Sequence, residues 1–318
     1  SFRRYIFYPI AIAMGIMLVL WPYAQLNPVA HTWKALNAFR NFHYPWPTLF
    51  EGKFTAGTEV PWYYMLKWYE IATPIPILTG FFIFLIFFLF QSSKATSSSV
   101  PGLASIPFKM MSGILLFAMI FPLCIAIFSH STFYNGLRHF LFFTPLMAVL
   151  AALGFWTFYR WLSLRMKLQD RAVKRFQFIF FGFIIISLLP VMKWQVNSHP
   201  NQYVYFNETI GGIQGAFGRF ATDYYGNADR QAAEWLNGFI KEKEVPGKLQ
   251  VCTLDGYIAG IYLNTDYFVY NPAKFDLSPC DIFLYNLQWG FGMEASHLHV
   301  VKVDGVPLVF VTINENHI

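Results

Sequence analysis

Charged residues are scarce in this sequence. Only 13% of its 318 residues are Asp, Glu, Lys or Arg, whereas an ordinary soluble domain carries about 25%. Apolar residues make up 56% and aromatic residues 20%, and the mean hydropathy is +0.40. This composition excludes a disordered chain, a collagen and a coiled coil. It predicts a protein that is solvated mainly by lipid.

Cysteine is also rare, with three residues in the whole chain. There is no Cys-x-x-Cys pair, no glycine-rich phosphate loop and no serine nucleophile elbow, which removes the common redox, nucleotide and hydrolase motifs. Cys252 and Cys280 lie in the polar C-terminal region, where a disulfide and two buried free thiols are both open alternatives. His297 and His299, spaced to share one face of a strand, are weak support for zinc, so we expect no metal site.

Five apolar segments approach the length of about 20 helical residues that crosses a bilayer. They cover residues 5–23, 71–90, 110–128, 140–159 and 176–192. The first segment follows Arg3 and Arg4, as a signal peptide would. Its apolar stretch is too long for a signal peptide, however, and no small-residue cleavage site follows it. We therefore expect five transmembrane helices.

Basic residues are concentrated between the fourth and fifth segments. The six are Arg160, Arg165, Lys167, Arg171, Lys174 and Arg175. By the positive-inside rule this loop is cytoplasmic, which places the N-terminus inside and the polar tail outside. The net charge of +6 thus reflects membrane orientation, and we expect no nucleic-acid partner.

The tail beyond the fifth segment has the length of one small domain. Apolar residues recur at helical spacing over 228–241, and short β-type runs follow at 249–254, 267–270, 282–285, 298–303 and 306–313. Asp304-Gly305 separates the last two runs and predicts a hairpin. The predicted fold is a transmembrane region of about five α-helices, residues 1–194, N-in and C-out. A small extracytoplasmic α/β domain, residues 195–318, follows it.

The outer loop, residues 24–70, contains more than a connection. Asn27 and Pro28 predict the start of a helix, and Val29, Trp33 and Leu36 give it an apolar face suited to the membrane interface. Charged side chains then alternate with aromatic ones. They are Glu51, Lys53, Glu59, Lys67 and Glu70. An aromatic belt alone would not carry these charges, so we expect a polar pocket at the bilayer surface.

Several ordered motifs carry a family resemblance. They are Leu49-Phe50-Glu51-Gly52, Pro61-Trp62-Tyr63-Tyr64, Thr73-Pro74, the run YNGLRHF at 134–140, the run HPNQYVYFN at 199–207, Gly211-Gly212 and Asp223-Tyr224-Tyr225. The chain resembles the C-terminal half of bacterial family-39-like glycosyltransferases of the GT-C class. The resemblance covers most of the chain.

The resemblance implies an inverting enzyme that moves a sugar from a polyprenyl-phosphate carrier to an acceptor. It places the reaction at the outer face of the bacterial inner membrane, with the C-terminal domain in the periplasm. Such enzymes carry a catalytic acid in the first outer loop of an N-terminal block, to which nothing in this sequence corresponds. The sequence is then a fragment of a longer enzyme, one half of a split enzyme, or a derivative that has lost the chemistry and serves as a scaffold. For catalysis we expect another membrane chain or a larger complex to supply the missing half. A divalent metal ion enters only if the complete enzyme requires one.

The site residues follow from what sugar transfer needs, a base for the acceptor and cations for the departing phosphate. Arg138 and His139 stand at the mouth of the fourth segment, where a guanidinium is suited to phosphate and the histidine could share its charge. Lys53 is a lesser candidate. Glu59 and Glu51 are weak candidates for the base. The alternative role for Arg138 is an interfacial anchor.

Two other functions fit a membrane protein of this composition. In the first, the chain is a non-catalytic scaffold or accessory subunit whose aromatic helices pack against other proteins of a larger assembly. In the second, it is a transporter, but transporters carry ionisable residues inside their spans. The second to fifth segments contain none, which counts against ion or proton coupling.

Overall fold

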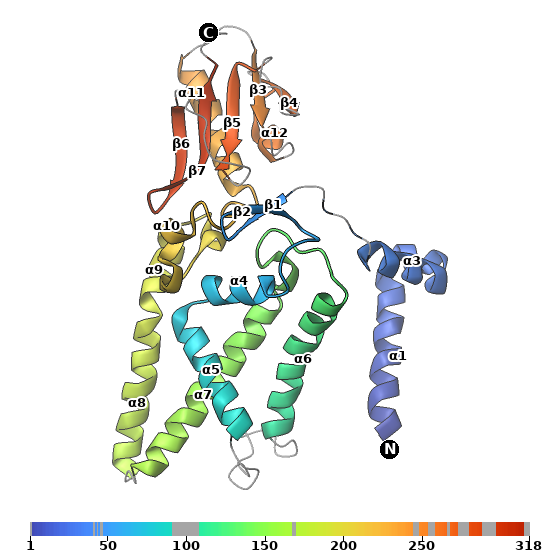
Figure 1. Cartoon of the computed structure of the whole chain (residues 1–318), viewed down its shortest axis with the longest axis vertical. Helices are drawn as coiled ribbons and strands as arrows, with labels where there is room; N and C mark the ends of the chain where they lie inside the picture. The colour runs from blue at the N-terminus through green and yellow to red at the C-terminus, as the bar shows by residue number, and fades with distance from the viewer. Residues whose placement is uncertain are drawn as a thin grey trace.

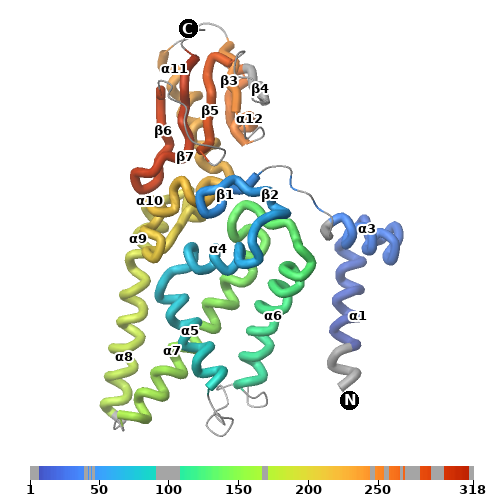
Figure 2. Tube along the Cα trace, viewed as in Figure 1, coloured from blue at the N-terminus to red at the C-terminus, as the bar shows by residue number. Residues whose placement is uncertain are grey.

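The computed structural model describes residues 2–40, 42, 44, 47–90, 108–166, 170–243, 248–253, 258–265, 268–272, 280–287 and 297–314. Long helices carry a layer of short elements, and a C-terminal sheet lies beyond that layer (Figures 1 and 2). Helix α1 (Phe2–Leu20) stands beside the other long helices rather than among them. The two ends of the chain therefore lie at opposite ends of the molecule.

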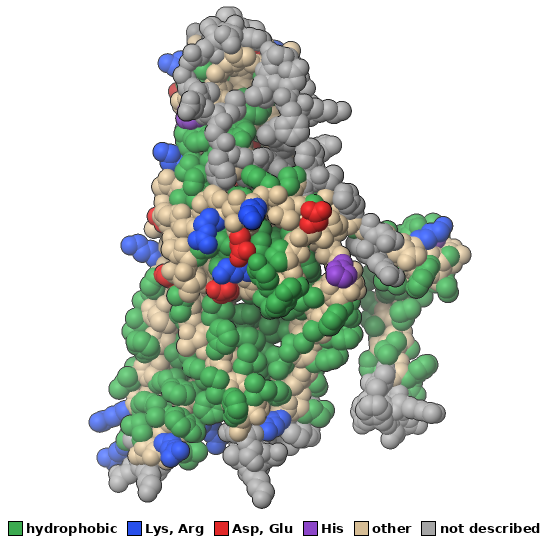
Figure 3. All heavy atoms as spheres, in the orientation of Figure 1, with side chains coloured by type: hydrophobic (Ala, Val, Ile, Leu, Met, Phe, Trp, Pro, Cys, Tyr) green, Lys and Arg blue, Asp and Glu red, His purple; other side chains and the backbone are tan. Residues whose placement is uncertain are grey.

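The long helices are strongly apolar. They are α5 (Ile75–Phe90), α6 (Phe108–Phe128), α7 (Phe143–Arg165), α8 (Asp170–Ser187) and α9 (Leu189–Asn197). Among the described residues, three helical stretches are long and apolar enough to cross a membrane: 108–128, 143–165 and 171–197, the last made of α8 and α9. The apolar stretches 7–20 and 75–90 are shorter. Apolar side chains cover this half of the molecule in Figure 3, which indicates a membrane protein.

The helix boundaries differ from the predicted segments for local reasons. The segment predicted to begin at residue 71 begins at 75 as α5, because Pro74 has no N–H to donate and holds Thr73 in an extended conformation. A separate helix, α4 (Tyr64–Ala72), ends just before this break. Helices α7 and α8 reach beyond their predicted segments at the end rich in Lys and Arg, because long basic side chains can extend toward water there.

Two glycines allow α5 and α7 to approach closely. A Cβ atom added at Gly154 would lie 2.0 Å from the carbonyl oxygen of Gly80 and 2.7 Å from the backbone nitrogen of Phe84. A Cβ atom at Gly80 would lie 2.8 Å from the carbonyl oxygen of Ala151. Small residues at the contact between two membrane helices permit this backbone approach. The sequence therefore fixes which faces of α5 and α7 meet.

A layer of short elements separates the long helices from the sheet. This middle layer comprises the hairpin of β1 (Pro47–Phe50) and β2 (Lys53–Ala56), helix α4, the 129–142 loop and residues 198–226. It also includes the short helices η2 (Arg138–Phe140), η3 (Gln202–Val204), η4 (Glu208–Ile210) and α10 (Gly212–Ala216). Its buried centre is aromatic, with Tyr64 and Trp68 among the largest fully buried side chains. One apolar core runs from α5 and α7 through this layer into the sheet.

The predicted interfacial helix is present as α3 (Pro28–Arg40), which follows the short helix α2 (Pro22–Leu26). The side-chain oxygen of Asn27 accepts a hydrogen bond of 3.0 Å from the backbone of Ala30, as an N-cap does. Val29 and Trp33 are exposed, as an interface would require. The β1–β2 hairpin and α4 were not predicted from the sequence of the outer loop.

Asn207 joins residues 198–226 of the middle layer to the break between α4 and α5. Its side-chain nitrogen donates to the carbonyl oxygens of Glu70 at 2.6 Å and Thr73 at 2.7 Å, and its backbone nitrogen donates to Ile71 at 2.8 Å. The residue is 0% exposed. Asn207-Glu208-Thr209 also reads as a glycosylation sequon, but the folded protein leaves no room for a glycan on this buried amide.

The C-terminal region is a five-stranded sheet with helices. The strands are β3 (Leu249–Thr253), β4 (Phe268–Pro272), β5 (Ile282–Asn286), β6 (His297–Val303) and β7 (Val306–Ile313). Their order is β4-β3-β5-β7-β6, with β3 parallel to both neighbours and β7 antiparallel to both of its own. Helix α11 (Asn227–Lys243) packs against β5, β6 and β7, and α12 (Ile258–Tyr262) packs against α11. This arrangement matches the predicted small α/β region.

The predicted hairpin lies between β6 and β7. Asp304 and Gly305 have φ angles of 49° and 80°, the left-handed pair that a two-residue hairpin turn requires. Pro307 pairs with Lys302, while the pairing of β7 with β5 begins only at Val309. The proline therefore lies beyond the end of the β5 ladder, where its missing N–H costs no hydrogen bond.

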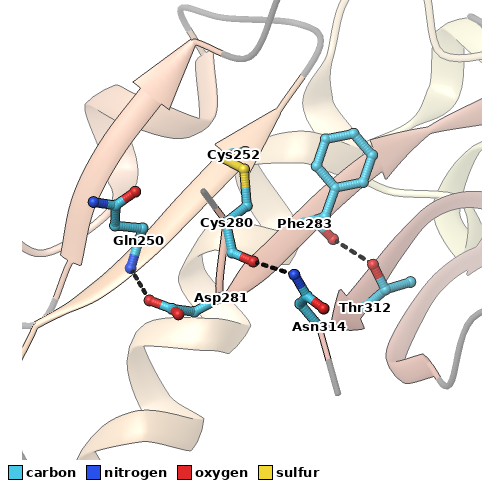
Figure 4. Close-up of a disulfide and its surroundings, with 7 residues drawn as sticks. All are labelled: Gln250, Cys252, Cys280, Asp281, Phe283, Thr312 and Asn314. Carbon is cyan, nitrogen blue, oxygen red and sulfur yellow. Dashed lines mark hydrogen bonds between the residues drawn. A yellow bond between two sulfur atoms is a disulfide. The ribbon is translucent and has the colours of Figure 1, made fainter. Parts of the chain in front are cut away.

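A disulfide joins Cys252 in β3 to Cys280 just before β5 (Figure 4). Both residues are buried. The neighbouring backbone is held as well, since Asp281 accepts a hydrogen bond of 2.7 Å from the backbone of Gln250 and Asn314 donates to the carbonyl oxygen of Cys280 at 3.1 Å. The sequence left open a disulfide or two buried free thiols at these positions, and the structure contains the disulfide.

Candidate functional site

Arg138 and His139, two of the three residues predicted to bind phosphate, follow a tight turn at the end of α7 nearest the sheet. Asn135 and Gly136 have φ angles of 53° and 64°, a left-handed pair that reverses the chain just before Arg138. The backbone nitrogen of Gly136 donates to the Tyr64 hydroxyl at 3.3 Å. A Cβ atom at this glycine would lie 2.9 Å from the Tyr224 ring. The turn is thus held between two buried tyrosines, which leave room for glycine alone.

Arg138 points out of this turn and is exposed. Its guanidinium carbon lies 5.8 Å from the centroid of the Tyr225 ring, within the range of a cation–π contact. The ion pairs found in the described part of the chain are Lys67–Glu70 and Arg230–Glu234, so no carboxylate there neutralises Arg138. The aromatic contact holds the side chain and leaves the planar donor fork open to an anion.

His139 lies next to the arginine and against two stacked tyrosines. Its ring meets Tyr134 edge to face at 4.6 Å, and Tyr134 stacks on Tyr44 at 3.7 Å. Desolvation by its neighbours, together with the charge of Arg138, lowers the pKa of His139 below 6.5. The imidazole is therefore mostly neutral at pH 7. It can exchange a hydrogen bond with a ligand, and the positive charge of the pair rests on Arg138.

Glu51 and Lys53 lie together at the turn between β1 and β2. Glu51 and Gly52 have φ angles of 51° and 81°, and the backbone nitrogen of Gly52 donates to the carbonyl oxygen of Arg219 at 2.8 Å. The Glu51 carboxylate accepts a hydrogen bond of 3.0 Å from the Tyr63 hydroxyl, which raises the pKa of Tyr63. Glu51 and Lys53 are both exposed.

Glu59 follows the hairpin and is exposed. Its backbone nitrogen donates to Ala56 at 2.8 Å, and two residues earlier the Gly57 carbonyl oxygen accepts a hydrogen bond of 2.9 Å from Phe133. This bond ties the end of the hairpin to the loop that leads to Arg138. In the described part of the chain, no side-chain hydrogen bond or ion pair joins Glu51, Lys53 or Glu59 to Arg138 or His139.

Both turns rest on the same buried ring. Tyr64 packs on Phe50 at the end of β1, with centroids 4.7 Å apart, and stacks against Phe133 at 6.0 Å. Burial raises the pKa of Tyr64 to about 12, so its hydroxyl stays protonated at physiological pH. The structure thus brings the predicted residues into one layer as two separate groups.

Asp223, Tyr225 and Tyr203 belong to the sequence motifs but were given no role from them, and Asn286 and Asp229 were not singled out. Tyr225 lies under Arg138, in a segment fixed by a buried polar cluster. The Asn286 side-chain nitrogen donates to Asp223 at 3.1 Å and Asp229 at 2.6 Å, and Tyr203 donates to Asp223. Asp223 also accepts a hydrogen bond from the backbone of Ala228 in the first turn of α11. Apart from Asp223 and Ala228, these partners lie 20 to 63 residues apart, and no local pattern joins them.

The two histidines of β6 do not share a face. A register shift lies between His297 and His299. His299 stacks on Trp235 of α11 at 4.3 Å, and His297 stacks on Phe310 at 4.0 Å. The expectation of a common face was wrong, because a β-bulge breaks the period of two. No cluster of three or more His, Cys, Asp or Glu that could hold a metal occurs among the residues described, so we derive no metal-dependent step.

No protein-family model, no curated protein sequence and no solved structure matches this chain. The geometry of the middle layer is therefore what indicates a function. That geometry offers the Arg138 guanidinium, which lies over an aromatic ring and has no carboxylate partner among the described residues, with the His139 imidazole beside it. The carboxylates stand apart from this pair, on the hairpin.

Proposed function

We propose that this chain binds a polyprenyl-phosphate-linked sugar as part of a GT-C class membrane glycosyltransferase. The observation that carries the proposal is Arg138. It is exposed, lies over Tyr225 and has no carboxylate partner in the described residues. A guanidinium held in this way can form two parallel hydrogen bonds to a phosphate. The neutral His139 beside it would donate or accept one more.

The proposed setting is the outer face of a bacterial inner membrane. In this setting α1, α5, α6, α7 and the α8–α9 pair are five spans, N-in and C-out, with the sheet in the periplasm. The disulfide supports this orientation because such bonds persist in oxidising compartments. The basic residues at the joined ends of α7 and α8 support it too, since Arg165, Arg171 and Arg175 are exposed there and would be cytoplasmic.

We also propose that sugar transfer requires a further membrane chain. Glu51 at the hairpin turn and Glu59 just after the hairpin are the acids we offer as a base, and no described contact connects them to Arg138. Helix α1 supports the need for a partner. None of its described side chains, Phe7 to Leu20, is buried, and it stands apart in Figure 1.

The experiment compares two arginines of the middle layer in the complete complex. Arg138→Ala should weaken binding of a polyprenyl-phosphate sugar by about 10- to 150-fold, the range of about 1.5–3 kcal/mol for hydrogen bonds to charged groups. Arg138→Lys should restore only part of this, because an ammonium lacks the planar fork. Arg219→Ala is the control, because Arg219 is also exposed and its guanidinium lies at the same 5.8 Å from an aromatic ring.

Equal binding by the wild type and both Arg138 variants would refute the phosphate role. The same holds if Arg219→Ala causes an equal loss, since the layer would then attract anions without a specific site. The alternative, a non-catalytic scaffold of a larger assembly, is favoured by the unburied α1. It would be supported if the complex forms normally while the wild type shows no carrier binding.

A further inference from the structure

The junction of α8 and α9 forms an open groove on the membrane side of the molecule. Helix α8 ends at Ser187 and α9 begins at Leu189 with Pro190 in its first turn. Since Pro190 has no N–H, the regular hydrogen bonding of the helix is interrupted here. The groove is lined by Ile186, Leu189, Pro190, Met192, Lys193, Val196 and Asn197.

Polarity changes along the groove in one direction. Its start is apolar, with Ile186, Leu189 and Met192 each at least half exposed. Its end nearest the middle layer carries Lys193 and Asn197, both exposed. The next helical residue, Trp194, packs edge to face on Tyr205 at 5.1 Å, which anchors this end of α9 to the middle layer. Such a gradient matches an amphiphile with its chain toward the bilayer centre.

The positive charge of Lys193 in the groove favours an amphiphile with an anionic headgroup. Lys193 has no carboxylate partner in the described part of the chain, and the Asn197 amide one turn further on can donate to an oxygen. An ammonium at the membrane surface attracts anionic lipid headgroups. The apolar walls lie on the 171–197 stretch, which is long enough to cross a membrane, so their natural contact is a hydrocarbon chain.

We propose that this groove is a binding site for an anionic glycerophospholipid, with one acyl chain against Ile186, Leu189 and Met192 and the phosphate on Lys193. The site is separate from the Arg138 turn. It does not depend on the chain being a glycosyltransferase. It depends only on α8 and α9 crossing the membrane.

The experiment measures lipid retention by the full-length chain, purified in detergent and examined by native mass spectrometry. Phosphatidylglycerol should bind in preference to phosphatidylcholine. Lys193→Gln should reduce phosphatidylglycerol affinity about fivefold, the effect of one lysine at an anionic surface, and leave phosphatidylcholine unchanged. Lys174→Gln is the matched control, because Lys174 is also exposed but lies in the first turns of α8.

A second variant tests the groove itself. Val196→Trp should fill it and reduce the retention of both lipids, while the helical circular dichroism stays that of the wild type. The proposal is overturned if phosphatidylglycerol binds equally to the wild type and Lys193→Gln. Equal losses from Lys174→Gln and Lys193→Gln would overturn it too, as would displacement of phosphatidylglycerol by an equimolar polyprenyl phosphate, which would assign the groove to the carrier lipid.

Discussion

Asn207 should be the most sensitive polar residue of the middle layer. Its side-chain nitrogen donates to two backbone oxygens, those of Glu70 and Thr73, at the break between α4 and α5. Its side-chain oxygen in turn accepts a hydrogen bond of 3.0 Å from the backbone of Thr209. The residue is fully buried, so water cannot replace these bonds in a variant.

The expected cost follows from the groups left unpaired. Asn207→Ala removes the donor from two carbonyl oxygens, and each buried group without a partner costs about 1–3 kcal/mol. We therefore expect the free energy of unfolding to fall by about 2–6 kcal/mol. Asn207→Asp should cost at least as much, because an ionised carboxylate cannot donate and would face the same two oxygens.

Urea unfolding in detergent micelles measures this loss. Tryptophan fluorescence follows the transition, and Trp68, whose ring lies 5.7 Å from that of Phe206, is one of the ten tryptophans that contribute to it. Asn197→Ala is the control, because Asn197 is exposed at the end of α9, and it should change stability by no more than about 0.5 kcal/mol. If Asn207→Ala also changed the free energy of unfolding by no more than about 0.5 kcal/mol, the hydrogen bonds of Asn207 would not stabilise the protein as predicted.

The remaining predictions concern helix packing and topology. Gly154→Ala should destabilise the α5–α7 contact by about 1–3 kcal/mol through overpacking, as measured by urea unfolding. Gly182→Ala is the control and should leave the stability unchanged, because its added Cβ would meet no atom within 4 Å. Equal stabilities of the two variants would disprove the close approach of α5 and α7. Cysteines introduced at the exposed positions Ser129 and Leu164 should react with an impermeant reagent in intact cells only at Ser129, and labelling at Leu164 would reverse the proposed orientation.

The C-terminal strands were predictable because their signals are local. Alternation, β-branched residues and the Asp304-Gly305 turn lie within the segments that they shape, and β3, β5, β6 and β7 begin within one residue of their predicted starts. The β1–β2 hairpin was missed because four-residue strands show almost no period. Its one signal was Glu51-Gly52, a pair that the structure places in left-handed conformation.

The candidate site was predictable only in part. Arg138 and His139 could be placed at the end of a span from hydropathy and sequence order. Their support could not, because Tyr64 and Tyr225 reach the turn from positions about 70 and 90 residues away. Aromatic residues are so frequent here, at 20% of the chain, that composition does not mark the few that form the core of the layer.

The pairing of Ala221 with Leu49 sets an order of assembly. These residues are 172 positions apart, so the ribosome completes the second about 9–34 s after the first at 5–20 residues per second. During that interval the hairpin lacks the backbone partner that closes its side. We conclude that the β1–β2 hairpin completes its backbone pairing only after helices α5 to α9 and the segment that follows them have been synthesised.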